Sequence, residues 1–116
     1  MDFKKQKPIY LQIADRLMEQ VLSAQLKADD RMPSVRDVAA QMGVNPNTVV
    51  RTYDYLQQEE IIFNRRGVGY FVADGAREHV LTLQRREFLD EELPYIRQRM
   101  KTLGIGINEL TLDDVI

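Results

Sequence analysis

The stretch that decides the fold runs from Met32 to Leu56 and reads MPSVRDVAAQMGVNPNTVVRTYDYL. It contains two helix-start signals, at Ser34 and Asn45, and a glycine, Gly43, lies between them. Serine and asparagine side chains accept hydrogen bonds from the free N–H groups of a first helical turn. Glycine ends helices because it readily adopts a left-handed backbone. The stretch therefore predicts two short helices joined by a tight turn, which is a helix-turn-helix.

The apolar positions of both predicted helices recur with the period of an α-helix, so each helix should bury one face. These positions are Val35, Val38, Ala39 and Met42 in the first helix and Val49, Tyr53 and Leu56 in the second. Pro46 supports the helix start at Asn45, because a proline in the first turn loses no hydrogen bond. The second helix then leaves Asn47, Thr48 and Arg51 facing outwards, with Val50 as a further candidate for this face.

Two short runs of β-branched and aromatic residues follow, at residues 61–64 and 70–73, around a glycine-containing loop. This pattern is typical of a β-hairpin. A hairpin directly after a helix-turn-helix is a wing. The loop holds Arg65, Arg66 and Gly67, and glycine lets a backbone approach a phosphate closely. The predicted fold class is mainly α with a small β-hairpin: a winged helix-turn-helix followed by C-terminal helices.

The rest of the chain is predicted to be helical. A helix from Ile9 to about Ala24 has an apolar face broad enough to pack against more than one neighbour. Residues 74–75, Asp-Gly, form the expected linker. We therefore predict a winged helix-turn-helix DNA-binding domain at residues 1–75 and a helical dimerisation region at residues 76–116.

Within the C-terminal region, apolar residues recur at steps of four and three, as in the a/d seam of a coiled coil. This seam either forms a dimer interface or packs on its own domain, and we expect dimerisation because a small domain offers little further core. Pro94 should kink or break the helix, and residues 107–116 should form a second short helix. The seam residues are Leu89, Leu93, Ile96, Met100 and Leu103.

The overall charge does not by itself indicate a nucleic-acid binder. The chain has 16 Lys and Arg against 18 Asp and Glu, a formal net charge of −2, whereas nucleic-acid-binding domains are usually basic. Any DNA affinity must therefore come from a local cluster of cations rather than from the overall field. The candidates are Arg36, Arg51, Arg65 and Arg66.

Each candidate contact has a structural alternative. Asn47 suits a bidentate contact with adenine, and Thr48 suits a phosphate or a thymine methyl group, but Asn47 is also a good first-turn residue. Arg36 could reach DNA or pair with a neighbouring aspartate. Arg51 could bind a phosphate or remain a solvated charge, and the wing arginines could contact DNA or keep a hairpin soluble.

Other function classes find little support. With no cysteine and one histidine, the chain has neither disulfides nor an obvious zinc site. Its carboxylates lie in surface runs such as residues 90–92 rather than in a converging catalytic set, so we expect neither an enzyme nor a cofactor. No apolar run could cross a bilayer and no signal peptide is evident, so we expect a cytoplasmic protein without membrane contacts. Binding of a small-molecule effector stays an open alternative, but no cluster of residues indicates a site for one.

Three motifs in register resemble the winged domain of the GntR family of bacterial transcription regulators. They are the segments 32–39, 43–49 and 65–72. The opening residues 8–13 and the recognition-helix segment 45–49 look most like the YtrA subfamily, whose short C-terminal region serves dimerisation. The resemblance implies a homodimeric DNA-binding regulator, and we expect it to repress transcription from a pseudo-palindromic operator. The alternative is a winged-helix protein-interaction module that does not bind DNA. By resemblance, the DNA contacts fall on Ser34, Arg36, Asn47, Thr48, Arg66 and Gly67.

This sequence also departs from the family pattern at three positions. Pro46 and Val50 stand where several members have arginine, and Glu60 stands where glycine commonly ends the recognition helix. The recognition helix is therefore less basic than in those members. We expect Asn47 and Thr48 to carry more of the base reading, while the remaining arginines hold the DNA backbone.

Overall fold

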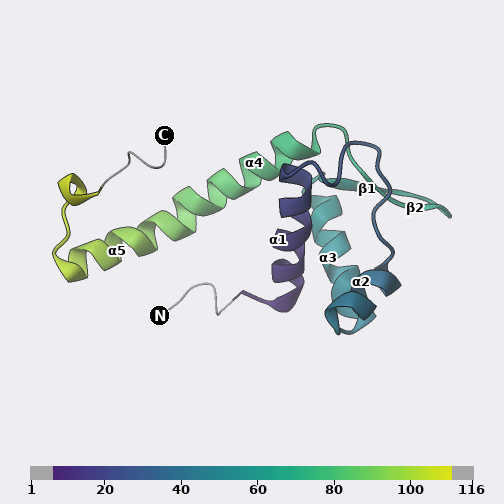
Figure 1. Ribbon diagram of the computed structural model, residues 1–116, viewed down its shortest axis with the longest axis horizontal. Coiled ribbons are helices and arrows are strands. Elements are labelled where there is room, and N and C mark those ends of the chain that lie inside the picture. The colour runs from purple at the N-terminus through teal and green to yellow at the C-terminus, as the bar shows by residue number, and fades with distance from the viewer. Residues whose placement is uncertain (1–6, 111–116) are drawn as a thin grey trace. The chain divides into compact units, whose positions relative to one another are not determined.

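A computed structural model describes residues 7–110 of the 116-residue chain. It is mainly helical with one two-stranded hairpin, so the predicted fold class is confirmed (Figure 1). The chain forms two compact units, which meet in sequence between Leu83 and Gln84. The elements are α1 (Ile9–Leu22), α2 (Val35–Met42), α3 (Pro46–Gln58), β1 (Ile62–Arg65), β2 (Gly69–Val72), α4 (Ala76–Glu87), a π-helical segment (Phe88–Glu92), α5 (Leu93–Leu103) and a 3-10 turn (Ile107–Glu109).

The two helix starts predicted for the helix-turn-helix are present with their caps. The Ser34 side chain accepts a hydrogen bond from the Asp37 N–H at 3.0 Å, and the Asn45 side chain accepts one from the Asn47 N–H at 2.8 Å. Between them Gly43 ends α2 in the left-handed conformation, with φ at 64°. Local side-chain chemistry thus fixes both helices and the turn that joins them.

The core of the first unit lies between α1 and α3, which run beside each other in Figure 1. The predicted stripe of α3 is its buried face, and Val49, Tyr53 and Leu56 have no exposed surface. The broad face of α1 is buried as well. The Thr52 hydroxyl donates a hydrogen bond to the Tyr10 carbonyl at 2.7 Å, which ties α3 to the first turn of α1.

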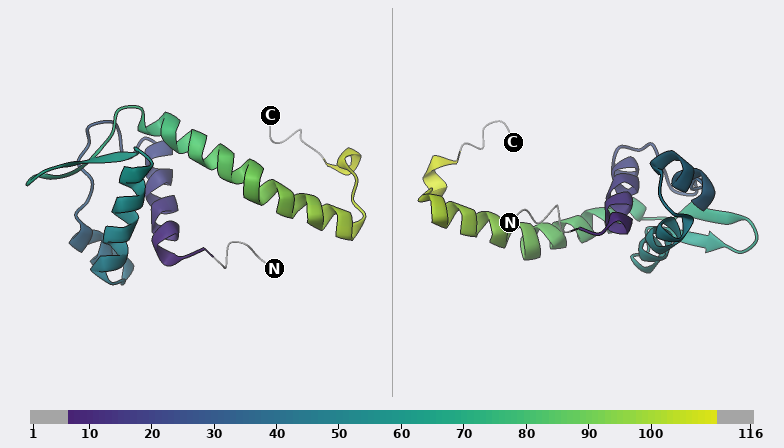
Figure 2. Two further views of the ribbon diagram at one scale, coloured as in Figure 1. Left: turned by 180° about the vertical axis from the view of Figure 1, so that it is seen from behind. Right: turned by 90° about the horizontal axis from the view of Figure 1, so that it is seen from below.

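The predicted hairpin projects beyond the helices of this unit (Figures 1 and 2). Its strands pair antiparallel, from Ile62 opposite Val72 to Arg65 opposite Gly69, and residues 66–68 form the turn. We predicted Arg65 in the loop, but it is the last residue of β1. It stays in the strand because its backbone completes the closing pair with Gly69.

An isolated β-bridge, which the sequence pattern does not predict, borders the hairpin. Arg31, in the segment between α1 and α2, pairs antiparallel with Phe71 of β2. The Met32 N–H donates to the Tyr70 carbonyl at 2.8 Å, and the Val72 N–H donates to the Asp30 carbonyl at 2.9 Å. The wing is therefore anchored along one edge by the segment that leads into α2.

The first turns of α4 belong to the winged unit. Ala76, Val80 and Leu83 are buried in its core, and the Arg77 guanidinium donates a hydrogen bond to the Leu22 carbonyl at the end of α1. The compact unit consequently continues past the linker expected at residues 74–75.

In the second unit the backbone stays helical as far as Leu103. The π-helical segment ends at Glu92, two residues before Pro94, close to the place where the sequence predicts a kink or break. Gly104, with φ at 67°, ends α5. Where we predicted a short second helix over residues 107–116, the structure has only a 3-10 turn. Residues 111–116 of that predicted helix lie outside the described residues.

Candidate nucleic-acid interface

The first turn of α3 presents a polar edge to the solvent. Because Val49, Tyr53 and Leu56 hold one face of the helix in the core, the rotation of α3 about its axis is fixed. Asn47 is exposed and Thr48 is half-buried at the margin of that core. The Asn47 backbone is already capped by Asn45, so its side-chain amide is presented by a rigid turn.

The exposed face of α3 continues with an apolar residue, and its arginine lies against α1. Val50 follows Asn47 by three residues, which places both on one side of the helix, and Val50 is 41% exposed. The Arg51 guanidinium lies 4.0 Å from the centre of the Tyr10 ring, in a cation–π contact. For Arg51 the sequence leaves two alternatives, a phosphate contact or a solvated charge. The structure adds a third, since this cation is held against an aromatic ring of α1.

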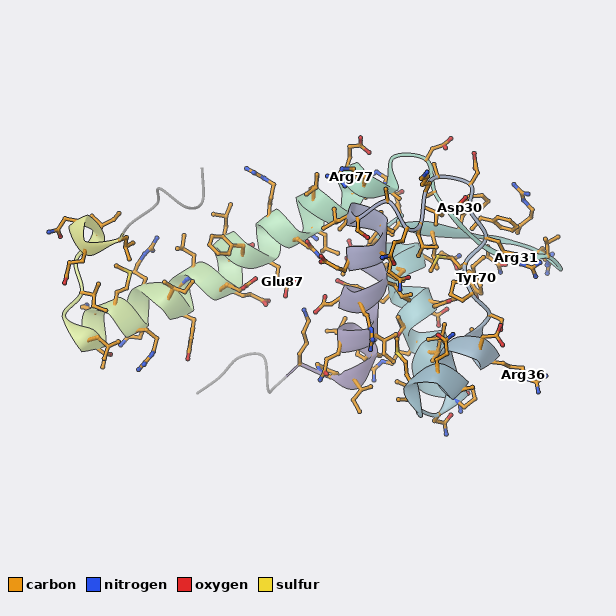
Figure 3. All side chains as sticks on the ribbon, viewed as in Figure 1. Asp30, Arg31, Arg36, Tyr70, Arg77 and Glu87 are labelled. Carbon is orange, nitrogen blue, oxygen red and sulfur yellow. The ribbon has the colours of Figure 1, made fainter. Side chains whose placement is uncertain are left out.

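The start of α2 presents a second part of the same unit. Arg36, the second residue of the helix, is exposed, and among the described residues it forms no ion pair with Asp37 or Asp54. Its side chain points outward in Figure 3. The Ser34 hydroxyl accepts the capping hydrogen bond of α2. Any contact of Ser34 with a ligand would therefore be made at the capped N-terminus of this helix.

A buried tyrosine joins α3 to the segment that enters α2. The Tyr53 hydroxyl donates a hydrogen bond to the Pro33 carbonyl, and its ring meets the Tyr70 ring edge-on, with centroids 5.0 Å apart. Burial, with smaller contributions from Tyr70 and Asp37, raises the pKa of the Tyr53 hydroxyl above its usual range. One side chain of α3 thus sets where both α2 and the hairpin lie.

The outer face of the wing stacks an arginine on two aromatic rings. Phe63 and Phe71 are stacked with centroids 5.9 Å apart, and the Arg65 guanidinium lies 4.5 Å from the Phe71 ring centre. Arg66 and Gly67 are exposed in the turn, and Gly67 has φ at 77°, which a glycine adopts without strain. The environments of the two wing arginines therefore differ, because the Arg65 guanidinium is held against the aromatic rings whereas Arg66 is exposed at the tip.

Arg31 is a cation of this region that the sequence pattern does not single out. Its guanidinium donates a hydrogen bond to the Val68 carbonyl in the wing turn at 2.7 Å. The partners are 37 residues apart in sequence, so no local spacing reveals the contact. In Figure 3 Arg31 and Arg36 both lie on the side of the unit away from α1.

Two other kinds of site have no counterpart in residues 7–110. The structure brings no three potential metal ligands from His, Cys, Asp or Glu together in that range. None of the helices between those limits is long and apolar enough to cross a membrane.

The first unit thus presents three features: the capped helix α3 with its exposed polar first turn, the exposed start of α2, and a hairpin with arginine at its tip. In this arrangement the N-terminus of the second helix can enter a major groove, and the hairpin can follow the neighbouring backbone. The fold and the site define a winged helix-turn-helix DNA-binding protein.

The family follows from comparison with known proteins. The model of the gntR family of bacterial regulatory proteins matches residues 9–72, which is more than half of the chain. The chain belongs to this family. It is accordingly a DNA-binding transcriptional regulator and not an enzyme, and the resemblance described above is confirmed.

The similarity to individual members extends beyond the winged domain. The chain is 38% identical to the transcriptional regulator YhcF of Bacillus subtilis over 108 residues, covering 93% of this chain and 88% of YhcF. It is also 38% identical to the transcriptional repressor YtrA of the same organism, over 90% of this chain and 75% of YtrA. A GntR-family regulator from Listeria monocytogenes has a similar structure, with a TM-score of 0.71 and 28% identity over 89% of both chains.

Proposed function

We propose that this chain is a homodimeric repressor that binds a pseudo-palindromic operator in the cytoplasm, with one winged domain on each half-site. The observation that carries the proposal is the exposed seam of the second unit. Leu89, Ile96 and Leu103 are 53%, 40% and 56% exposed in the single chain. No residue of α5 is buried. A second copy of the seam would cover these side chains.

A dimer through this seam also explains how a small domain could read a long site. Two identical copies related by a two-fold axis present two identical recognition helices, and a pseudo-palindrome has the same symmetry. The proposed dimerisation region is residues 76–116, and the proposed DNA-binding domain is residues 1–75. The first turns of α4 would then join the two functions, since they are packed in the core of the winged unit.

For DNA, we assign base reading to α3 and backbone contacts to the arginines. The exposed Asn47 amide could pair with the N6 and N7 atoms of adenine, and the neighbouring Val50 offers an apolar contact for a thymine methyl group. We therefore expect A·T pairs in each half-site. Arg51 is the weakest assignment because its guanidinium lies over Tyr10. The remaining contacts are assigned to Ser34, Arg36, Thr48, Arg65, Arg66 and Gly67.

Repression is the expected direction of regulation because the similar protein YtrA is a repressor. A dimer that occupies an operator overlapping a promoter would block access of RNA polymerase. Expression from a reporter with the operator placed over its promoter tests this sign, and an increase in expression on adding the protein would contradict it.

Selection of bound sequences from a random DNA pool is the most informative test of the whole proposal. We expect two inverted half-sites with a fixed spacing close to one or two helical turns. A single half-site without symmetry would contradict the dimer. A double variant, Asn47→Ala with Arg66→Ala, then tests the assigned face: unchanged affinity and salt dependence would favour a protein-interaction module instead.

A further inference from the structure

We propose that Arg31 is a positioning residue for DNA binding: it fastens the wing turn and so places Arg66. The inference rests on the proposed function, because it assumes that the wing contacts DNA. It assigns a role to a residue that lies outside the winged hairpin and outside the recognition helix. The evidence is a set of contacts that all meet at one guanidinium.

The first observation is the face of the sheet on which Arg31 lies. Arg31 stands directly opposite Phe71 in an isolated antiparallel bridge, and residues directly opposite in an antiparallel pair share a face. Phe63 and Arg65 share this face, because Phe63 is paired with Phe71 and Arg65 follows by two residues. Arg31 is therefore on the outer side of the wing, whereas Tyr70 points to Tyr53 in the core.

The second observation is that Gly69 leaves room for the Arg31 side chain. A Cβ atom at Gly69 would lie 3.2 Å from Arg31 Nε and 3.4 Å from Nη2. With no side chain there, the guanidinium passes over the Gly69 backbone and reaches the Val68 carbonyl at 2.7 Å. Gly69 thus has a steric reason to be glycine, in addition to its φ of 143°.

The third observation is how little else holds the turn. Within residues 66–68, the backbone hydrogen bond from the Val68 N–H to the Arg65 carbonyl, at 2.9 Å, closes the turn. Two-stranded hairpins are only marginally stable by themselves. A charge-assisted hydrogen bond from Arg31 is stronger than a neutral one, so it should restrict the motion of the tip that bears Arg66.

Restricting the tip should favour binding by lowering the entropy lost when the wing meets DNA. Arg31 also sits one residue before Met32, in the segment that leads to the start of α2. The contact therefore links the turn of the wing to the segment that leads to Arg36. Arg36 and Arg66, the two proposed contacts with the DNA backbone, would then keep a fixed position relative to each other.

A double-mutant cycle between Arg31→Ala and Arg66→Ala tests this role, with DNA affinity measured on a site selected from the random pool. If Arg31 acts by placing Arg66, each single variant should weaken binding roughly 5- to 20-fold, and the double variant should be no more than about twofold weaker than Arg66→Ala. Exchange of the backbone amides of residues 66–68 with solvent should also be faster in Arg31→Ala than in the wild type.

Arg36→Ala combined with Arg66→Ala is the matched control. Arg36 is also an exposed arginine, but within residues 7–110 no hydrogen bond, ion pair or ring contact joins it to the wing turn, so the effects of these two substitutions should multiply. Multiplying effects for the Arg31 pair would overturn the positioning role and leave the proposed function intact. An Arg31→Ala variant that weakens binding while Arg66→Ala does not would also overturn it, and the wing assignment would then fail as well.

Discussion

The winged unit buries an apolar core within one chain, whereas none of the described residues of the C-terminal unit is buried. In the described part of the chain, every buried residue lies between Ile13 and Leu83. After Leu83, large apolar side chains recur but stay in contact with solvent. Both regions show helical periodicity in sequence, so periodicity alone does not distinguish them.

The difference teaches that an apolar stripe has to be interpreted with the elements that surround it. In α3 the stripe meets α1, α2 and the hairpin, and burial of these side chains stabilises the fold of a single chain. In α5 the described unit offers no second layer to cover the stripe. We infer that the winged unit completes its own core and that the second unit requires a second copy.

The largest expected effect comes from placing charges in the seam. Leu93→Asp with Ile96→Asp would bury four carboxylates in the dimer, and unpaired buried charges are strongly unfavourable. We expect monomers by sedimentation velocity and a loss of operator affinity of roughly 100-fold or more, because the two half-sites are no longer bound together.

The matched control places the same charges on the other side of α5. Gln98→Asp with Thr102→Asp adds the same two carboxylates at exposed positions away from the seam. This variant should remain a dimer. A wild-type sedimentation coefficient for the seam variant, or dissociation of both variants alike, would remove the seam from its assigned role.

A pair of leucine truncations sharpens the comparison between the units. Leu56→Ala creates a cavity in the winged core, where Leu56 has no exposed surface, and should lower the free energy of unfolding by about 3 kcal/mol. Leu103→Ala should change the stability of the winged unit by less than about 0.5 kcal/mol. Urea unfolding of both variants measures these changes.

Leu103→Ala should act instead on association. Its expected result is a weaker dimer, with the midpoint of dissociation shifted to higher protein concentrations, measured by sedimentation. If Leu103→Ala lowered the free energy of unfolding as much as Leu56→Ala does, the result would contradict the division into a winged unit that folds by itself and a C-terminal unit that depends on a second copy.

Much of the fold could be predicted from the sequence because its signals are local. Ser34, Gly43 and Asn45 act within a few residues of themselves, and each has the conformation expected of it. The bridge between Arg31 and Phe71 could not be predicted in this way. Residues 29–32 pair with a strand about 40 residues later, and they have no alternating pattern of their own.

For the site, the sequence could indicate which side chains face outwards but not what they contact. Helical periodicity places Asn47 on the solvent side of α3, as the structure has it. The contact of Arg51 with Tyr10 and that of Arg31 with Val68 depend on how distant segments pack. A list of arginines therefore overstates how many cations are equally available to a phosphate.

Asn47→Ala is expected to have a moderate effect confined to recognition. If the amide reads one adenine in each half-site, affinity for the selected site should fall about tenfold. Affinity for a site in which that A·T pair is replaced should change little. Gln58→Ala, exposed at the far end of α3, is the control and should bind both sites as the wild type does.

Tyr53→Phe should have a smaller effect that depends on pH. Removing the hydroxyl leaves the Pro33 carbonyl without this donor, and the free energy of unfolding at neutral pH should fall by about 1 kcal/mol. Because burial raises the pKa of Tyr53 in the folded state, an unfolded chain loses this proton first, near the ordinary tyrosine pKa of about 10.

The stabilisation from the Tyr53 hydroxyl is therefore fully present below pH 10 and is lost as the pH rises further. The stability difference between wild type and Tyr53→Phe should shrink over that range in urea unfolding. A constant difference up to pH 11 would show that the hydroxyl does not titrate with unfolding.

The smallest expected effect lies at the corner where α3 gives way to the hairpin. Glu60 adopts φ of 62°, a left-handed conformation that glycine adopts freely but that strains a glutamate. Glu60→Gly should relieve this strain and raise the free energy of unfolding by roughly 0.5–1 kcal/mol, the gain being reduced by the greater freedom of glycine in the unfolded chain. Gln58→Gly, at the last residue of α3, should instead lower it by less than about 1 kcal/mol. If Glu60→Gly proves neutral or destabilising, the Glu60 side chain must stabilise the corner by as much as its backbone strains it, and the self-contained winged unit would depend on a surface residue as well as on its core.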